Sequence, residues 1–129
     1  MDRSDVYQDG LDFTSRTVDC DLTFTASTSG AVPTTLTRAN GIKSVVLTST
    51  EYLVTFQDVY QELLNVQITI QQASFSASAS CYGVISSANV GAASTSPNTV
   101  GVTFLKGSDG TAVVATINDI VRVRFNFKR

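Results

Sequence analysis

The sequence predicts an all-β protein, an antiparallel β-sandwich or barrel of about six to eight strands with an extended N-terminal arm. Three observations support this prediction. Apolar and polar residues alternate with a period of two in several short segments, and turn signals separate these segments at spacings of about 8–15 residues. No long amphipathic helix is available to connect parallel strands. With 129 residues, the chain has the size of one domain with a substantial core.

The clearest alternation closes the chain, in residues 120–129. It places four apolar side chains inward and four polar ones outward: Val121, Val123, Phe125 and Phe127 against Arg122, Arg124, Asn126 and Lys128. A similar strand begins at Cys20, with Leu22, Phe24 and Ala26 on its inner side. Further strands are expected at 42–49, 52–57, 66–71, 81–86, 99–106 and 111–116. The less regular pattern of residues 42–49 predicts burial on both faces.

One short helical turn is expected at about residues 58–64, between two of these strands. Asp58 is a favourable N-cap, and Gln61 follows three residues later, as in a capping box. The turn would carry the chain across the end of the sandwich and plug its core with Val59, Leu63 and Leu64.

Residues 1–21 are expected to form an arm, followed by a single β-sandwich domain over residues 22–129. The arm holds six Asp and two Arg, a net charge of −4, with a few apolar residues spread between them: Val6, Tyr7, Leu11 and Phe13. Such a segment is too polar to fold alone, and we expect it to become ordered by docking, through these apolar residues, on a neighbouring subunit or equally on the surface of a larger assembly such as a capsid. The alternative is a frayed terminus. The basic last strand, with Arg122 and Arg124, is a candidate surface for the same contact.

The composition argues against most catalytic and cofactor sites. The chain has no histidine, so a Ser-His-Asp triad and histidine metal ligands are excluded. No glycine-rich loop carries a lysine at phosphate-binding spacing, and Ser108–Gly110 lacks the further oxygen ligands of a calcium loop. Cys20 and Cys81 are expected to be thiols, small hydrophobic side chains rather than zinc ligands. We therefore predict no catalytic, cofactor-binding or metal-binding residues, no cofactor and no enzymatic activity.

Charge and hydropathy set expectations for location and partners. The net charge is −2, and the aromatic side of the last strand faces the core, so nucleic acid is not an expected partner. No segment approaches the roughly 18 apolar residues that span a membrane. The acidic start of the chain lacks a signal-peptide core, so we expect synthesis in a cytoplasm without membrane attachment.

Residues 38–129 resemble small structural proteins of tailed bacteriophages. The resemblance rests on ANGIKSVVLTSTEYLVTFQDVYQELLNVQITI, with its Tyr-x-Val-Thr-hydrophobic-Gln-Asp motif and Leu-Leu pair, and on the closing VGVTFLKGSDGTAVVATINDIVRVRFNFKR. The resemblance implies a virion component assembled in the bacterial host cytoplasm. Its most specific form is a capsid decoration (cement) protein, a homotrimer on the capsid surface that clamps neighbouring copies of the major capsid protein. The alternatives are a tail, adaptor or fibre component and a receptor- or carbohydrate-binding β-sandwich.

Overall fold

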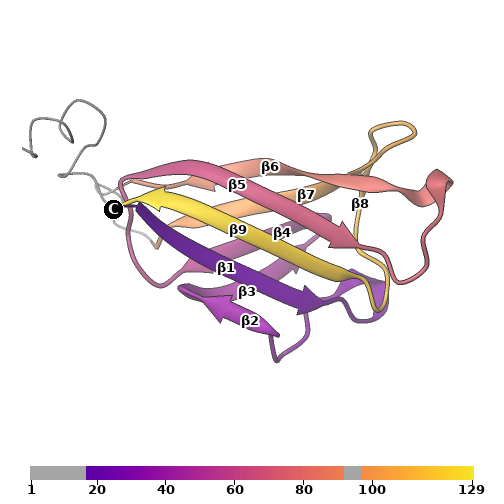
Figure 1. Ribbon diagram of the computed structural model, residues 1–129, viewed down its shortest axis with the longest axis horizontal. Coiled ribbons are helices and arrows are strands. Elements are labelled where there is room, and N and C mark those ends of the chain that lie inside the picture. Colours follow the sequence, from indigo (N-terminus) through magenta and orange to yellow (C-terminus); the bar gives the residue numbers. More distant parts are fainter. Residues whose placement is uncertain (1–16, 92–96) are drawn as a thin grey trace, which may run out of the picture.

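A computed structural model describes residues 17–91 and 97–129, which form nine strands in two antiparallel sheets (Figure 1). The predicted all-β class is therefore confirmed. Within the described residues, the helical structure consists of two single 3-10 turns, η1 (Thr28–Gly30) and η2 (Ala77–Ala79).

Sheet A contains the first and last strands of the described chain as neighbours. Its order is β2-β1-β9-β5, and β9 pairs along its whole length with β1 on one side and β5 on the other. The bounds of these strands are Thr17–Thr25 for β1, Arg38–Asn40 for β2, Glu62–Gln71 for β5 and Ile120–Lys128 for β9.

Sheet B lies behind sheet A in Figure 1 and has the order β3-β4-β7-β6, with the short β8 also paired to β7. Its strands are β3 (Ile42–Thr48), β4 (Glu51–Phe56), β6 (Cys81–Asn89), β7 (Thr99–Lys106) and β8 (Ala112–Val113). The two sheets approach each other where β5 and β6 run side by side. Gly83 is required there, since a Cβ atom at this position would collide with Ile68.

The core lies between the sheets and is built from the inward residues of each alternating strand. The predicted inner face of β9 is confirmed, because Val121, Val123, Phe125 and Phe127 are all buried. Phe56 of β4 meets the last two edge-on, with ring centroids 4.9 Å and 4.7 Å away. Edge-to-face aromatic pairs at such distances add stability beyond the buried area.

The predicted helical turn at residues 58–64 is wrong. Residues 57–61 cross from sheet B to sheet A as a loop, and β5 already begins at Glu62. Glu62 and Leu63 pair with Lys128 and Phe127 of β9. A seven-residue helix has a costly nucleus and few hydrogen bonds, so strand pairing prevails over the local capping signal of Asp58.

Tyr60 closes this end of the core, together with Leu63, the only one of the three predicted aliphatic residues that packs against it. The ring of Tyr60 stacks on Phe127 with centroids 4.4 Å apart, and its N–H donates to Asn98 Oδ1 over 2.6 Å. Val59 and Leu64 are 47% and 45% exposed, so they do not plug the sandwich.

Two further expectations need correction. Residues 42–49 were expected to be buried on both faces, but β3 is an edge strand, with Val46 54% exposed. Residues 17–21 were assigned to the arm, but they belong to β1 and pair with β9. Residues 1–16, including Val6, Tyr7, Leu11 and Phe13, lie outside the described part of the chain.

Replacing Phe125 by Ala tests the inner face of β9. Loss of a fully buried aromatic side chain is expected to reduce the free energy of unfolding by about 3–5 kcal/mol, measured by urea denaturation. Arg122→Ala, on the outer face of the same strand, should change it by about 0.5 kcal/mol or less. Equal effects of the two substitutions would contradict the alternation.

A second pair of substitutions separates a loop from a capped helix at residues 57–61. Tyr60→Ala should cost about 3–5 kcal/mol, because it removes a buried aromatic side chain. Asp58→Ala should change the free energy of unfolding by no more than about 0.5 kcal/mol. A loss of about 1–2 kcal/mol at Asp58, typical of an N-cap, would restore the helical turn.

Candidate partner-binding surface

The described residues hold no group of three or more His, Cys, Asp or Glu side chains that could bind a metal ion. In the same part of the chain, no helix is long and apolar enough to cross a membrane.

Both thiols have a raised pKa. Cys20 is buried, and its Sγ lies 3.5 Å from the Tyr60 hydroxyl. Burial is the main cause of its raised pKa, and the nearby carboxylate of Asp21 adds to it. Burial, followed by the charge of Asp119, also raises the pKa of Cys81. Because the thiolate is the nucleophilic form, neither side chain is prepared for covalent chemistry.

A carboxylate lies across the outer face of sheet B. Glu51 of β4 reaches over Gly101 of β7, and its Oε2 accepts hydrogen bonds from the Ser86 and Ser87 hydroxyls of β6. A side chain at Gly101 would collide with Glu51 and Ser87. Thr103 donates to Ser86 over 2.8 Å. This arrangement connects three strands, so its clear role is to hold the sheet together.

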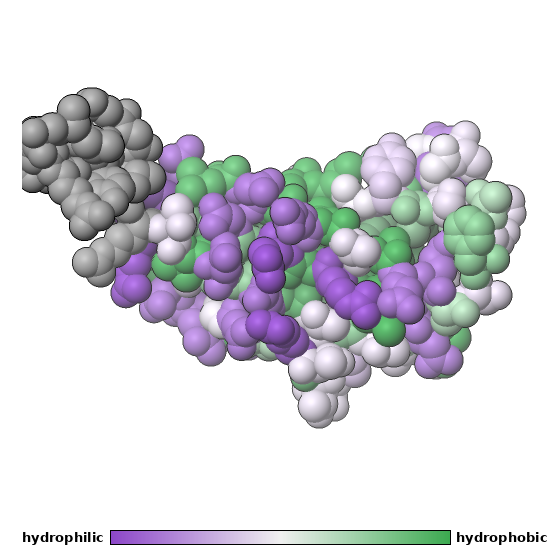
Figure 2. Space-filling model, in the orientation of Figure 1, coloured by the Kyte–Doolittle hydropathy of each residue, from purple (hydrophilic) through white to green (hydrophobic). Residues whose placement is uncertain are grey.

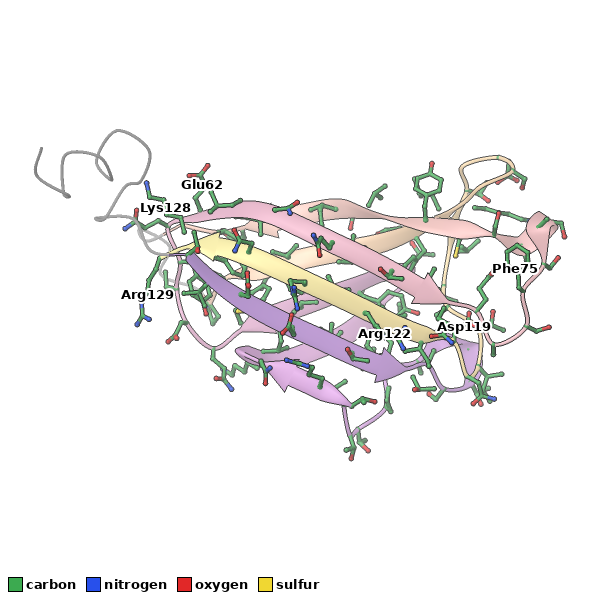
Figure 3. The ribbon with its side chains drawn as sticks, viewed as in Figure 1. Glu62, Phe75, Asp119, Arg122, Lys128 and Arg129 are labelled. Carbon is green, nitrogen blue, oxygen red and sulfur yellow. The ribbon has the colours of Figure 1, made fainter. Side chains whose placement is uncertain are left out.

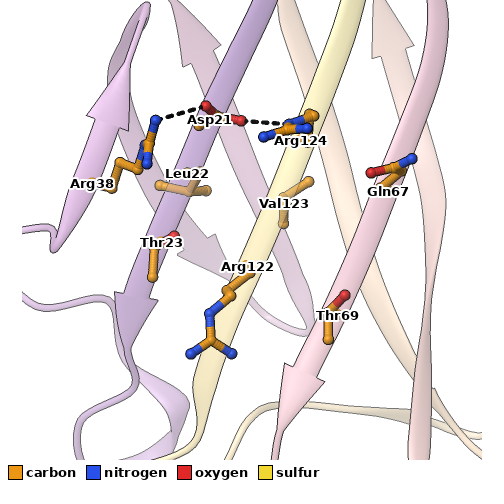
Figure 4. Close-up of a pocket in the computed structure, with 9 residues that line it drawn as sticks. All are labelled: Asp21, Leu22, Thr23, Arg38, Gln67, Thr69, Arg122, Val123 and Arg124. Carbon is orange, nitrogen blue, oxygen red and sulfur yellow. Dashed lines mark hydrogen bonds and ion pairs between the residues drawn. The ribbon is translucent and has the colours of Figure 1, made fainter.

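The outer face of sheet A is hydrophilic and hollowed. The view in Figure 2 looks onto this face, where hydrophilic side chains predominate along the middle. An open depression of about 410 Å³ lies across four strands (Figure 4). Its lining residues are Asp21, Leu22, Thr23, Arg38, Gln67, Thr69, Arg122, Val123 and Arg124.

Asp21 holds one half of the depression in place. Its Oδ2 pairs with Arg38 Nη2 over 3.2 Å, and its Oδ1 accepts a hydrogen bond from Arg124 Nε over 3.0 Å. The hydrogen bond to Asp21 raises the pKa of Arg124 above its ordinary value. One carboxylate on β1 thus joins β2 to β9 and fixes two guanidinium groups beside each other.

Arg122 occupies the other half without a carboxylate partner among the described residues. Its Nη1 donates to the neutral Oε1 of Gln71 over 2.9 Å. The strand register places Thr23 and Thr69 on either side of it. Three guanidinium groups and one carboxylate line the depression, which leaves two positive charges unbalanced. The geometry therefore suits an oxyanion, and guanidinium is the side chain best shaped to bind one.

The predicted site residues divide into two groups. Arg122 and Arg124 lie exposed on the same face, and their role in binding a partner stays a prediction. Val6, Tyr7, Leu11 and Phe13 lie outside the described residues.

The sequence alone did not identify five other residues as part of the site: Asp21, Thr23, Arg38, Gln67 and Thr69. The outward alternation of Asp21 and Thr23 was a visible signal, but nothing in the sequence paired their strand with β9.

The chain was compared with protein-family models, with curated proteins and with solved structures. None of the three comparisons finds a match.

Thiol reactivity tests the pKa directions. Because burial and Asp119 raise the pKa of Cys81, its reaction with a chromogenic disulfide reagent should be slower at neutral pH than that of unfolded protein. The rate should increase as the pH rises and continue to increase beyond the ordinary thiol pKa of about 8.5. Cys20, 1% exposed, should react only after denaturation in urea. Rapid reaction of the folded protein at neutral pH would contradict this description.

Proposed function

We propose that this chain is a structural protein of a bacteriophage virion, a capsid decoration protein that binds the outer capsid surface. It stabilises the capsid by clamping neighbouring subunits of the major capsid protein. Two observations support the proposal. Residues 38–129 resemble small structural proteins of tailed phages, and the all-β fold agrees with that resemblance.

The observation that carries the proposal furthest is the outer face of sheet A. It presents a nine-residue central strand with outward Arg, Asn and Lys side chains between two long neighbours. Non-obligate interfaces are about as polar as ordinary protein surface, and arginine is enriched in them. In the proposed complex, this face lies against the capsid.

The receptor-binding alternative has one observation in its favour. Phe75, on the loop between β5 and β6, is 77% exposed at the opposite end of the sandwich from Lys128 and Arg129 (Figure 3). Tyr82 of β6 is 50% exposed. Exposed aromatic rings are common at binding hot spots. Copy number separates a decoration protein from the other alternative, a tail or fibre component, since a decoration protein is far more abundant in the virion.

The capsid-facing surface is tested with two exposed polar positions on opposite sheets. Gln67 points outward from sheet A and Ser44 from sheet B, and each is replaced by Arg. Binding to capsids that lack this protein is measured by co-sedimentation. Gln67→Arg is expected to weaken binding about tenfold or more, because a longer, charged side chain in the middle of this face disturbs both its shape and its charge complementarity to the capsid. Ser44→Arg should bind like the wild type.

The wild-type protein should also raise the temperature at which such capsids release their DNA. Failure of the wild-type protein to bind capsids would overturn the proposed function. A loss of binding confined to Ser44→Arg would place the capsid on sheet B and contradict the assignment to sheet A.

A further inference from the structure

The depression on sheet A has an unbalanced positive charge, and the same chain contains a segment of opposite charge. Residues 1–16 contain four carboxylates, Asp2, Asp5, Asp9 and Asp12, and two arginines. The segment therefore carries a net charge of −2 from its side chains, against the two unbalanced positive charges of the depression. Complementary charge favours association between the two and sets its orientation.

We infer that the depression around Arg122 binds the acidic segment 1–16 of a second copy of this chain. The contact deepens the proposed function by naming one partner of the sheet A surface, and its biological setting rests on that proposal. An Asp carboxylate of the incoming segment would accept hydrogen bonds from the Arg122 guanidinium. The Thr23 and Thr69 hydroxyls and the Gln67 amide supply further polar contacts around it.

Arg122 is the best receptor in the depression because no carboxylate of the described residues offsets its charge. Arg38 and Arg124 already share the Asp21 carboxylate. Arg122 donates to one neutral amide oxygen, so most of its five N–H groups remain for a ligand. A neutral partner offsets none of its charge.

The direction of β1 favours a second copy over the same molecule. The described chain enters sheet A at Thr17, beside Lys128, and reaches the depression four residues later at Asp21, about 13 Å along the strand. The preceding residues would have to reverse direction to cover their own depression. Sixteen residues extend up to about 55 Å, enough to reach the same face of a neighbour. Such a contact joins two different surfaces, and where its rotation closes after three copies it forms a ring, the arrangement of a homotrimer.

The test uses full-length chains in sedimentation velocity experiments without capsids. Three variants are compared with the wild type. The first, Arg122→Gln, removes the receptor. The second replaces Asp2, Asp5, Asp9 and Asp12 together by Asn and so removes the acidic ligand. The third, Lys128→Gln, is the matched control, because it removes a positive charge from the outer face of the same strand outside the depression.

The wild type and Lys128→Gln are expected to self-associate with rising concentration. Arg122→Gln should weaken the association constant about tenfold or more, the effect of one charge-assisted contact. The four-Asn variant should behave likewise. An equimolar mixture of these two variants should form heterodimers, because one contributes an intact acidic segment and the other an intact depression.

A wild-type chain that stays monomeric would overturn the inference, since the segment then binds its own depression or none. A mixture that remains monomeric would overturn it too, as would an equal loss with Lys128→Gln. Because capsids are absent from these experiments, their outcome does not bear on capsid binding. The co-sedimentation experiment tests the proposed function separately.

Discussion

The position of β9 between β1 and β5 is the constraint on which the rest of this structure depends. Successive side chains of a strand point to opposite faces, so one register fixes both sides of the sheet. Phe125 and Phe127 enter the core only if Arg122 and Arg124 face outward. A shift by one residue would bury two guanidinium groups and expose two aromatic rings. The register that packs the core therefore also holds the arginines of the depression on the outer face at a defined spacing.

The pairing of the first strand with the last has consequences for folding and for the ends of the sandwich. β1 and β9 are separated by most of the chain, and contacts between distant segments form slowly because a long loop must close first. At the Thr17 end, Tyr60 covers the core between the sheets. At the opposite end, the buried carboxylate of Asp119 accepts backbone N–H bonds from Ala73 and Thr116 over 2.9 Å each. The single carboxylate of Asp119 thus holds the loop after β5 and the loop before β9 together.

The sequence could predict which face each strand buries, because a period of two is a local property. It could not predict which strands pair. To predict the depression from the sequence, three strand pairings would have to be known: β1 with β2, β1 with β9, and β9 with β5. One of these strands, β2, has only three residues and no periodic signal. The prediction of a helical turn at residues 58–64 was wrong because it relied on a local signal alone. Asp58 and Gln61 give a genuine local capping pattern, but the pairing of Glu62 with Lys128 draws the following residues into a strand. Local signals prevail only where no distant strand competes for the same backbone.

The central claim is that sheet A, rather than sheet B, is the face by which this protein binds its assembly. A cryo-EM map of the purified virion, with the sandwich fitted into the density, tests this claim most directly. We expect the outer face of sheet A to lie against capsid density, with the strands of sheet B towards solvent. Density that places sheet A towards solvent, or the chain only at the tail, would contradict it.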